Sequence, residues 1–189
     1  MSKRANLGHL MVDIETLGTG NRAVILSIAA VEFDLATGTT GDYFYDSIDL
    51  KSSLDLSREI DADTIQWWFK QSAEARECLF NGTDFLTVLD NFKHYVEAFI
   101  ADLAMLGKDP QVWCNGINFD FAILKNALSN NTPWPYWSER DVRTIVSLNP
   151  SIKEAMPFNG TQHNALHDCY HQIKYCSATY QFLLHNSLF

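Results

Sequence analysis

Three apolar segments near the N-terminus constrain the fold of this chain more than any other feature. Residues 10–14 and 24–33 are apolar runs with strong β character, and the turn-forming segment 18–21 lies between them. Residues 43–50 continue the pattern after a second turn-rich stretch at 37–41. These segments predict a three-stranded meander, in which strands adjacent in the sequence pair with each other.

The hydrophobic period changes to that of a helix after residue 61. Ile65, Trp68 and Phe69 recur at helical spacing, which predicts a helix directly after the meander. Further elements are predicted as a helix at 84–103, a strand at 111–114, a helix at 119–128, a short helix at 141–148 and a long helix at 164–184. Strands that alternate with helices indicate an α/β layered fold.

Length and composition favour a single domain over residues 1–189. The chain is 47% hydrophobic, which is enough to form one core without disulfides or structural metals. Its 23 acidic and 14 basic side chains give a formal net charge of −9. Because binding along duplex DNA requires a basic face, this charge disfavours a long nucleic-acid footprint more than it disfavours nuclease chemistry at a strand end.

Targeting signals are not recognisable in the sequence. The first ten residues lack the apolar core of a signal peptide, and no run reaches membrane-spanning length. The four cysteines contain no C-x-x-C pair and lie in apolar segments, which is typical of reduced thiols. We therefore expect a cytoplasmic protein without a membrane partner.

Three groups of polar residues are candidates for a catalytic centre. Asp13 and Glu15 lie two apart at the end of the first strand, so both carboxylates point to the same side. Two solvated loop acids are the alternative reading. Asp120 follows the fourth strand, where it can also act as an ordinary acid at a helix N-terminus. His163 and Asp168 span the start of the last helix.

The order of these residues is more specific than any one of them. It resembles the DEDDh branch of the DnaQ-like exonucleases, which have a ribonuclease H-like fold with a mixed central β-sheet flanked by α-helices. The matching motifs are Val12-Asp13-Ile14-Glu15-Thr16, Asn118-Phe119-Asp120 and His163-Asn164-Ala165-Leu166-His167-Asp168.

A narrower resemblance covers more of the chain. It is to the bacterial and phage subgroup that includes the exonuclease VIII-like and mycobacterial ribonuclease-like proteins. Its segments are 64–71, 113–120, 133–137 and 140–144. The sequence departs from the broader family at Asn115-Gly116, where many members carry His-Asn, so contacts made there by those members are not carried over. Homodimerisation is also expected by resemblance.

The resemblance implies a metal-dependent 3′-5′ exonuclease. Asp13, Glu15, Asp120 and Asp168 would hold two Mg²⁺ or Mn²⁺ ions, with Asp13 between them, and His163 would act as general base. His167 and His171 are rival bases on the same helix, interpreted as packed or solvated side chains. The expected substrate is a single-stranded 3′ end of RNA or DNA. A dinucleotide hydrolase and a non-catalytic nucleic-acid-binding module of the same fold are the alternatives.

Further residues are candidate nucleic-acid contacts. Trp67 and Trp68 point about 100° apart on a helix, so we expect one to pack and the other to stack on a terminal base; two core aromatics are the alternative. Gln71 is a candidate for reading a base edge, and Asn118 is a contact candidate within its motif. Arg140 is a candidate phosphate ligand, whereas Arg143 is predicted to be structural.

Overall fold

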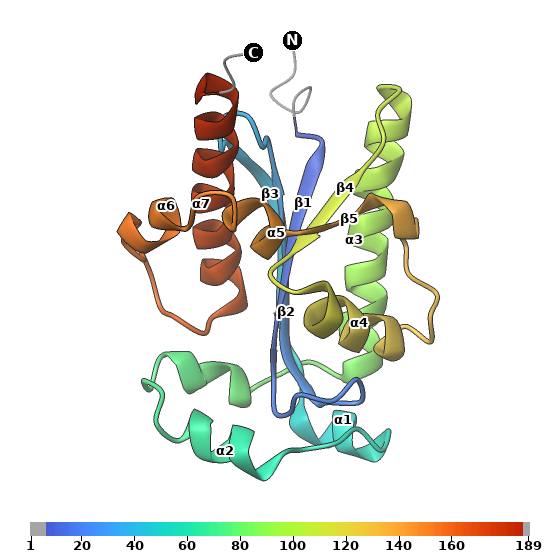
Figure 1. The fold of residues 1–189 in the computed structure, drawn as a ribbon. Helices are drawn as coiled ribbons and strands as arrows, with labels where there is room; N and C mark the ends of the chain where they lie inside the picture. Colours follow the sequence, from blue (N-terminus) through green and yellow to red (C-terminus); the bar gives the residue numbers. More distant parts are fainter. Residues whose placement is uncertain (1–6, 187–189) are drawn as a thin grey trace.

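The computed structural model describes residues 7–186 and contains a five-stranded mixed sheet in the order β3-β2-β1-β4-β5 (Figure 1). The strands are β1 His9–Thr16, β2 Ile25–Phe33, β3 Thr40–Ser47, β4 Gln111–Cys114 and β5 Glu139–Asp141. The first three pair antiparallel, whereas β4 is parallel to both β1 and β5. The carboxyl ends of β1 and β4 therefore meet at one edge of the sheet.

Helices cover both faces of this sheet (Figure 1). The helix α7 packs on β1 and β2 together with α5, and α3 and α4 cover the opposite face. The longer helices are α3 Phe85–Met105 and α7 Ala165–Asn186. The shorter helical elements are α1 Leu50–Asp55, α2 Ala62–Trp68, η2 Ala75–Leu79, η3 Ile117–Phe121, α4 Ala122–Ala127, η4 Tyr136–Ser138, α5 Val142–Val146 and α6 Pro150–Ala155. Within residues 7–186, none of these helices is long and apolar enough to cross a membrane.

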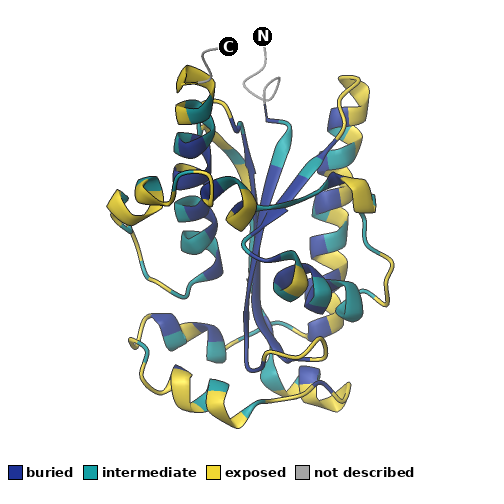
Figure 2. Ribbon diagram, in the orientation of Figure 1, coloured by how far each residue is buried: buried dark blue, intermediate teal, exposed yellow. Residues whose placement is uncertain are grey.

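The alternation of side chains along β1 divides the core into two layers. Leu10, Val12 and Ile14 pack against residues of α3, and Met11 packs against residues of α7. The central strands are buried along almost their whole length (Figure 2). Because side chains alternate with a period of two, Asp13 and Glu15 share the α7 face with Met11.

The predicted meander, the mixed sheet flanked by helices and the long C-terminal helix are confirmed. Two boundaries were wrong. Leu50 begins α1 instead of ending a strand, since Asp49 caps this helix by accepting a hydrogen bond from the Ser52 N–H. No strand was predicted before the short helix at 141–148, but Glu139–Asp141 forms β5. Its three residues carry no strand signature, and only the parallel pairing with β4 makes them a strand.

Candidate active site

The first motif lies on the carboxyl half of β1, between β2 and β4. Asp13 and Glu15 are each only 9% exposed, which rules out the alternative that they are solvated loop acids. Gln172 of α7 donates from its Nε2 to the Asp13 Oδ1 at 2.7 Å. The two carboxylates of β1 thus face the side of α7 that packs on the sheet. Burial there disfavours their ionised form.

Asp120 reaches the same place from a π-helical turn, η3, that follows β4. The turn begins after Gly116, whose φ of +145° disfavours any other residue type. The buried Asp120 carboxylate accepts a hydrogen bond from the backbone of Ile14. This bond joins the second motif directly to the strand that carries the first, and π-helical turns occur often at functional sites.

The third motif is held at the start of α7. His163 has a left-handed backbone conformation, with φ of +62°, and lies in the loop just before the helix. Backbone groups of His163 and Asn164 hydrogen-bond to the Asp168 carboxylate, so the loop and the helix position each other. Potential ligand atoms of Glu15, His163 and Asp168 all lie within 4.8 Å of one another.

Burial disfavours ionisation of all four carboxylates, and repulsion within the cluster adds to this effect at Asp13 and Glu15. Burial, followed by repulsion from Asp120, Glu15 and Asp168, raises the pKa of Asp13 well above its usual value. Burial and the neighbouring Asp168 and Asp120 do the same for Glu15. Burial also raises the pKa of Asp120 to about 7 and that of Asp168 to about 6. Protein groups alone therefore leave the negative charge of this cluster undercompensated.

The donor set fits a divalent cation. The buried Oδ2 of Asp168 has no hydrogen-bond partner among the described residues, which leaves a lone pair directed at no protein donor. Carboxylate oxygens are the ligands that Mg²⁺ and Mn²⁺ prefer. The acidic residues can thus form a metal site, which explains how a fold retains so many buried acids.

We expect the metal-free protein to lose stability as the pH rises from about 5 to about 8. The folded-state pKa values of Asp168 and Asp120, about 6 and about 7, exceed their usual value of 3.8, so the folded state binds more protons than the unfolded state in this interval. Stability is highest at the acidic end and falls as these carboxyls ionise, by on the order of 2–4 kcal/mol. Urea denaturation in EDTA at three pH values measures this loss, and added Mn²⁺ should restore stability at pH 8. A flat or rising stability profile contradicts the expectation.

The rival histidines are occupied elsewhere. His167 accepts a hydrogen bond from the Thr161 N–H through its Nδ1, and its ring packs over Gly160. His171 packs between the rings of Phe158 and Tyr175. Of the three histidines, His163 is the one grouped with Glu15 and Asp168.

The two tryptophans have different environments. Trp68 is buried, and its Nε1 donates to the Thr16 carbonyl at 2.8 Å. Trp67 is 39% exposed and makes an edge-to-face contact with the His163 ring, with centroids 4.6 Å apart. Trp68 therefore packs in the core, as one of the two was expected to do. Trp67 is accessible, and it also contacts the His163 ring.

The other two candidate base contacts differ in position. Gln71 donates from its side-chain amide to the Trp67 carbonyl, and it lines a surface cavity together with His163. Asn118 is exposed on η3, two residues before Asp120. The shared cavity places Gln71 near His163, and contact of either Gln71 or Asn118 with nucleic acid remains a prediction.

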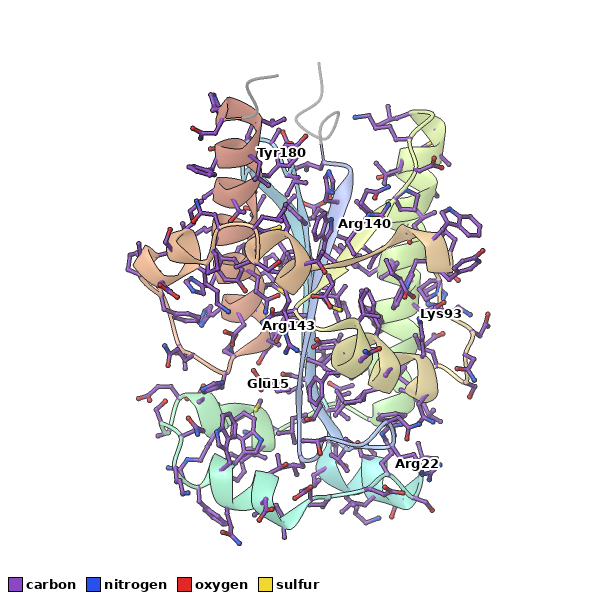
Figure 3. The ribbon with its side chains drawn as sticks, in the orientation of Figure 1. Glu15, Arg22, Lys93, Arg140, Arg143 and Tyr180 are labelled. Atoms are coloured by element: carbon purple, nitrogen blue, oxygen red, sulfur yellow. The ribbon has the colours of Figure 1, made fainter. Side chains whose placement is uncertain are left out.

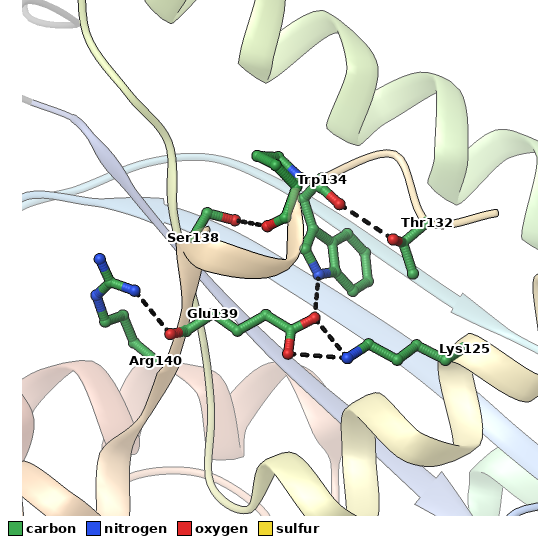
Figure 4. Close-up of polar contacts among 7 residues, drawn as sticks. Lys125, Thr132, Trp134, Ser138, Glu139 and Arg140 are labelled. Atoms are coloured by element: carbon green, nitrogen blue, oxygen red, sulfur yellow. Dashed lines mark hydrogen bonds and ion pairs between the residues drawn. The ribbon is translucent and has the colours of Figure 1, made fainter. Parts of the chain in front are cut away.

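Arg140 is not brought to the carboxylates. In the sheet register, Arg140 of β5 is paired with Trp113 of β4, which is paired in turn with Met11 of β1. Arg140 therefore does not lie beside the carboxyl end of β1. Its guanidinium donates to the carbonyls of Trp137 and Glu139 at 2.8 and 2.7 Å. Figure 4 shows this cluster, in which the Glu139 carboxylate also accepts from Lys125. The placement gives no support to Arg140 as a phosphate ligand, because its donors are turned to the backbone.

Arg143, predicted to be structural, approaches the site instead. Its guanidinium lies over Gly116, where a Cβ atom would come within 3.1 Å of the Arg143 Cζ. Its charge lowers the pKa of Asp120 against the larger effect of burial. Figure 3 shows Arg143 between Arg140 and Glu15. The Asn115-Gly116 departure from the broader family thus makes room for an arginine.

Gln172 is a site residue that sequence reasoning missed. It lies one helical turn after Asp168, on the same face of α7, and is 4% exposed. The available signal was a polar residue between apolar positions, next to Ile173 and one turn before Cys176. That signal is weak, because such a glutamine is usually solvated.

Comparison with known proteins agrees with this geometry. Residues 8–180 match the family described as the 3′-5′ exoribonuclease Rv2179c-like domain. An exodeoxyribonuclease of Enterobacteria phage T4 is 28% identical over 193 residues, which cover 84% of this chain and 83% of the relative.

Solved structures share the fold at low sequence identity. Cell-death related nuclease 4 superposes with a TM-score of 0.61 at 14% identity over 95% of this chain, which spans 64% of that chain. E. coli exonuclease I, in complex with a dA13 oligonucleotide, gives 0.59 at 14% identity over 95% of this chain, which spans only 40% of that chain. S. pombe Pop2p, in a Mg²⁺- and Mn²⁺-bound form, gives 0.58 at 12% identity over 97% of this chain and 85% of that one.

The ribonuclease H-like fold and the predicted DEDDh 3′-5′ exonuclease are both confirmed. The family match extends over nearly all of the described residues, from the first strand to the last helix. The chain therefore belongs to the Rv2179c-like 3′-5′ exoribonuclease domain family.

Proposed function

We propose that this 3′-5′ exonuclease removes nucleotides from the 3′ end of single-stranded RNA or DNA in a reaction that requires two divalent ions, Mg²⁺ or Mn²⁺. The observation that carries the proposal is the convergence of four carboxylates and His163 from three separate chain segments on one site. Four mutually repelling acids destabilise a fold, and metal binding is the simplest compensation.

Each of the four acidic side chains is proposed to bind a metal ion. Asp13 lies among the other three acids and would contact both ions, while Glu15 and Asp168 would hold one and Asp120 the other. When bound, the ions supply positive charge that activates water and stabilises the charge developing on the phosphate and the leaving oxygen. Gln172 keeps the Asp13 carboxylate in a single orientation through its 2.7 Å hydrogen bond.

His163 would accept the proton from the attacking water. Burial lowers the pKa of its imidazole, so the neutral form that can accept a proton predominates at pH 7. The edge-to-face contact with Trp67 limits rotation of the ring. The backbone bonds between the His163 loop and Asp168 set the distance from the base to the acidic cluster.

The substrate proposal rests on both the site and the relatives. The exposed part of the Trp67 indole offers an aromatic surface to an unpaired base, and stacking of this kind is tolerant of sequence. The family is described as exoribonuclease and the phage T4 relative as an exodeoxyribonuclease, so both sugars are included in the proposal. The similarity to a phage protein also supports action in the cytoplasm of a bacterial host.

Single-stranded RNA and DNA oligonucleotides, each labelled at the 5′ end, test the proposal. With Mn²⁺ or Mg²⁺ we expect a ladder of products that shorten from the 3′ end, and the same substrates with EDTA should stay intact. A 3′ label should appear at once in mononucleotide. Cleavage confined to dinucleotides would support a dinucleotide hydrolase instead, and the absence of any metal-dependent product would contradict both.

A further inference from the structure

A cavity of about 520 Å³ opens directly beside Glu15, on the side of the carboxylates that faces α2. Figure 3 shows Glu15 near the end of the sheet that α2 covers. The cavity walls come from the end of β1, the following loop, the start of α2 and η3. Its lining includes Glu15, Thr16, Asp61, Asp63, Trp67 and Phe119.

Two aromatic side chains shape this cavity. Trp67 is on α2 and Phe119 is on η3, so they reach the cavity from elements far apart in the sequence. Trp67 also contacts the ring of His163, which places one edge of the cavity against the proposed general base. Aromatic walls next to acidic metal ligands suit a nucleoside whose phosphate lies at the carboxylates.

Some polar groups of the lining are already engaged in hydrogen bonds within the protein. The Thr16 hydroxyl donates to the Gly18 carbonyl at 2.7 Å. The Asp61 Oδ1 accepts from the N–H groups of Asp63 and Thr64, at 2.7 and 3.4 Å, and thereby caps α2. The Thr16 hydroxyl hydrogen and the backbone N–H groups of Asp63 and Thr64 are therefore not available to donate to a ligand.

The Asp63 carboxylate is different. It is exposed, it lines the cavity, and within residues 7–186 its side chain has no hydrogen bond or ion pair. An ionised carboxylate accepts hydrogen bonds but cannot donate them, whereas the hydroxyls of Thr19 and Thr64 can do both. Asp63 can therefore discriminate between ligands by the presence of a donor, which the threonines cannot do.

We propose that this cavity binds the 3′-terminal nucleoside and that Asp63 selects it by accepting a hydrogen bond from a donor on that nucleoside. The donor is either an exocyclic amino group, present on adenine, cytosine and guanine but not on uracil or thymine, or the ribose 2′-hydroxyl. This selection rests on the proposed 3′-5′ exonuclease activity and adds the residue that sets its preference.

Four oligonucleotides test the proposal, identical except for the 3′-terminal residue, which is A or U in a ribose or a deoxyribose form. The kcat/KM for removal of this residue is measured for wild type, Asp63→Ala and Asp63→Asn. Asp63→Ala removes the acceptor, and Asp63→Asn retains a neutral acceptor. Asp55→Ala, an exposed acid on α1 with the same change of charge, is the matched control.

We expect wild-type protein to prefer the terminus that carries the selected group, the exocyclic amino group or the 2′-hydroxyl, by about tenfold, the effect of a hydrogen bond to a charged group. Asp63→Ala should abolish this preference, Asp63→Asn should retain part of it, and Asp55→Ala should leave it unchanged. Loss of the A-over-U preference in both sugars identifies the amino group, and loss of the ribose-over-deoxyribose preference at both bases identifies the 2′-hydroxyl.

Two outcomes overturn the inference and leave the proposed function standing. One is an active wild-type enzyme without preference among the four termini, and the other is an equal change of all four rates in Asp63→Ala, as expected of a general charge effect. Inhibition constants of the four free mononucleotides, measured with the same variants, should follow the same order. Circular dichroism confirms that each variant is folded. Failure of the proposed function itself appears separately, as a wild-type protein without exonuclease activity.

Discussion

Replacing Asp13 with asparagine is expected to lower kcat by about 10³-fold and at the same time to stabilise the metal-free protein. Loss of the central metal ligand removes several kcal/mol of transition-state stabilisation, which corresponds to about this factor. The folded protein becomes more stable because Asp13 is buried near three other carboxylates, and the neutral amide ends its repulsion with them. The amide oxygen of asparagine can still accept the hydrogen bond from Gln172.

The stability gain should depend on pH in a defined direction. Because the pKa of Asp13 is raised in the folded state, the wild-type carboxyl is protonated at low pH and the variant then has no advantage. At pH 8 in EDTA we expect a gain on the order of 1–3 kcal/mol. Urea denaturation at both pH values measures it, with Asp90→Asn on the surface of α3 as the control. A destabilised Asp13→Asn protein in EDTA would argue against an undercompensated acidic cluster.

Replacing His163 with alanine is expected to lower kcat by about 10²–10⁴-fold, the usual contribution of a general base. Metal binding should persist, since the four carboxylates that are proposed to hold the ions are unchanged. The increase in melting temperature on addition of Mn²⁺ reports metal binding independently of turnover. We therefore expect a large loss of activity together with a metal-induced shift close to that of wild type.

The exposed His94 on α3 provides the matched control for this experiment. His94→Ala should change neither kcat nor the metal-induced shift. If His163→Ala loses the metal-induced shift in proportion to its activity, His163 is a metal ligand and not the general base. This outcome is meaningful because His163 lies within the same 4.8 Å group as Glu15 and Asp168.

Much of the fold follows from local patterns. The meander was predictable because its first two strands are apolar runs and turn residues separate all three strands. The helices α3 and α7 were predictable because their apolar positions recur at helical spacing. The strand β5 was not predictable, since Glu139–Asp141 is polar and short. Its conformation depends on hydrogen bonds to β4, whose paired residues lie 27 positions earlier in the chain.

The candidate site divides in the same way. Asp13, Glu15, Asp120, His163 and Asp168 were recognisable because their order and spacing match a family motif. Arg143 and Gln172 were not recognisable as neighbours of the acids, because the helical pattern around each of them accounts for a polar residue at that position. The roles of Trp67 and Trp68 also could not be assigned from adjacent helical positions alone.

The sequence by itself determined the chemical type of the centre, since the five motif residues and their order are properties of the chain. The tertiary structure decided which other groups surround that centre. Burial beneath α7 and mutual repulsion raise the pKa values of the acids. The π-helical turn brings Asp120 to the end of β1, and Arg143 of α5 lies over Gly116 at the start of that turn. Residues of α2, among them Asp63, line the adjacent cavity. These properties depend on distances between elements far apart in the sequence, and only the packing of the sheet and its helices sets those distances.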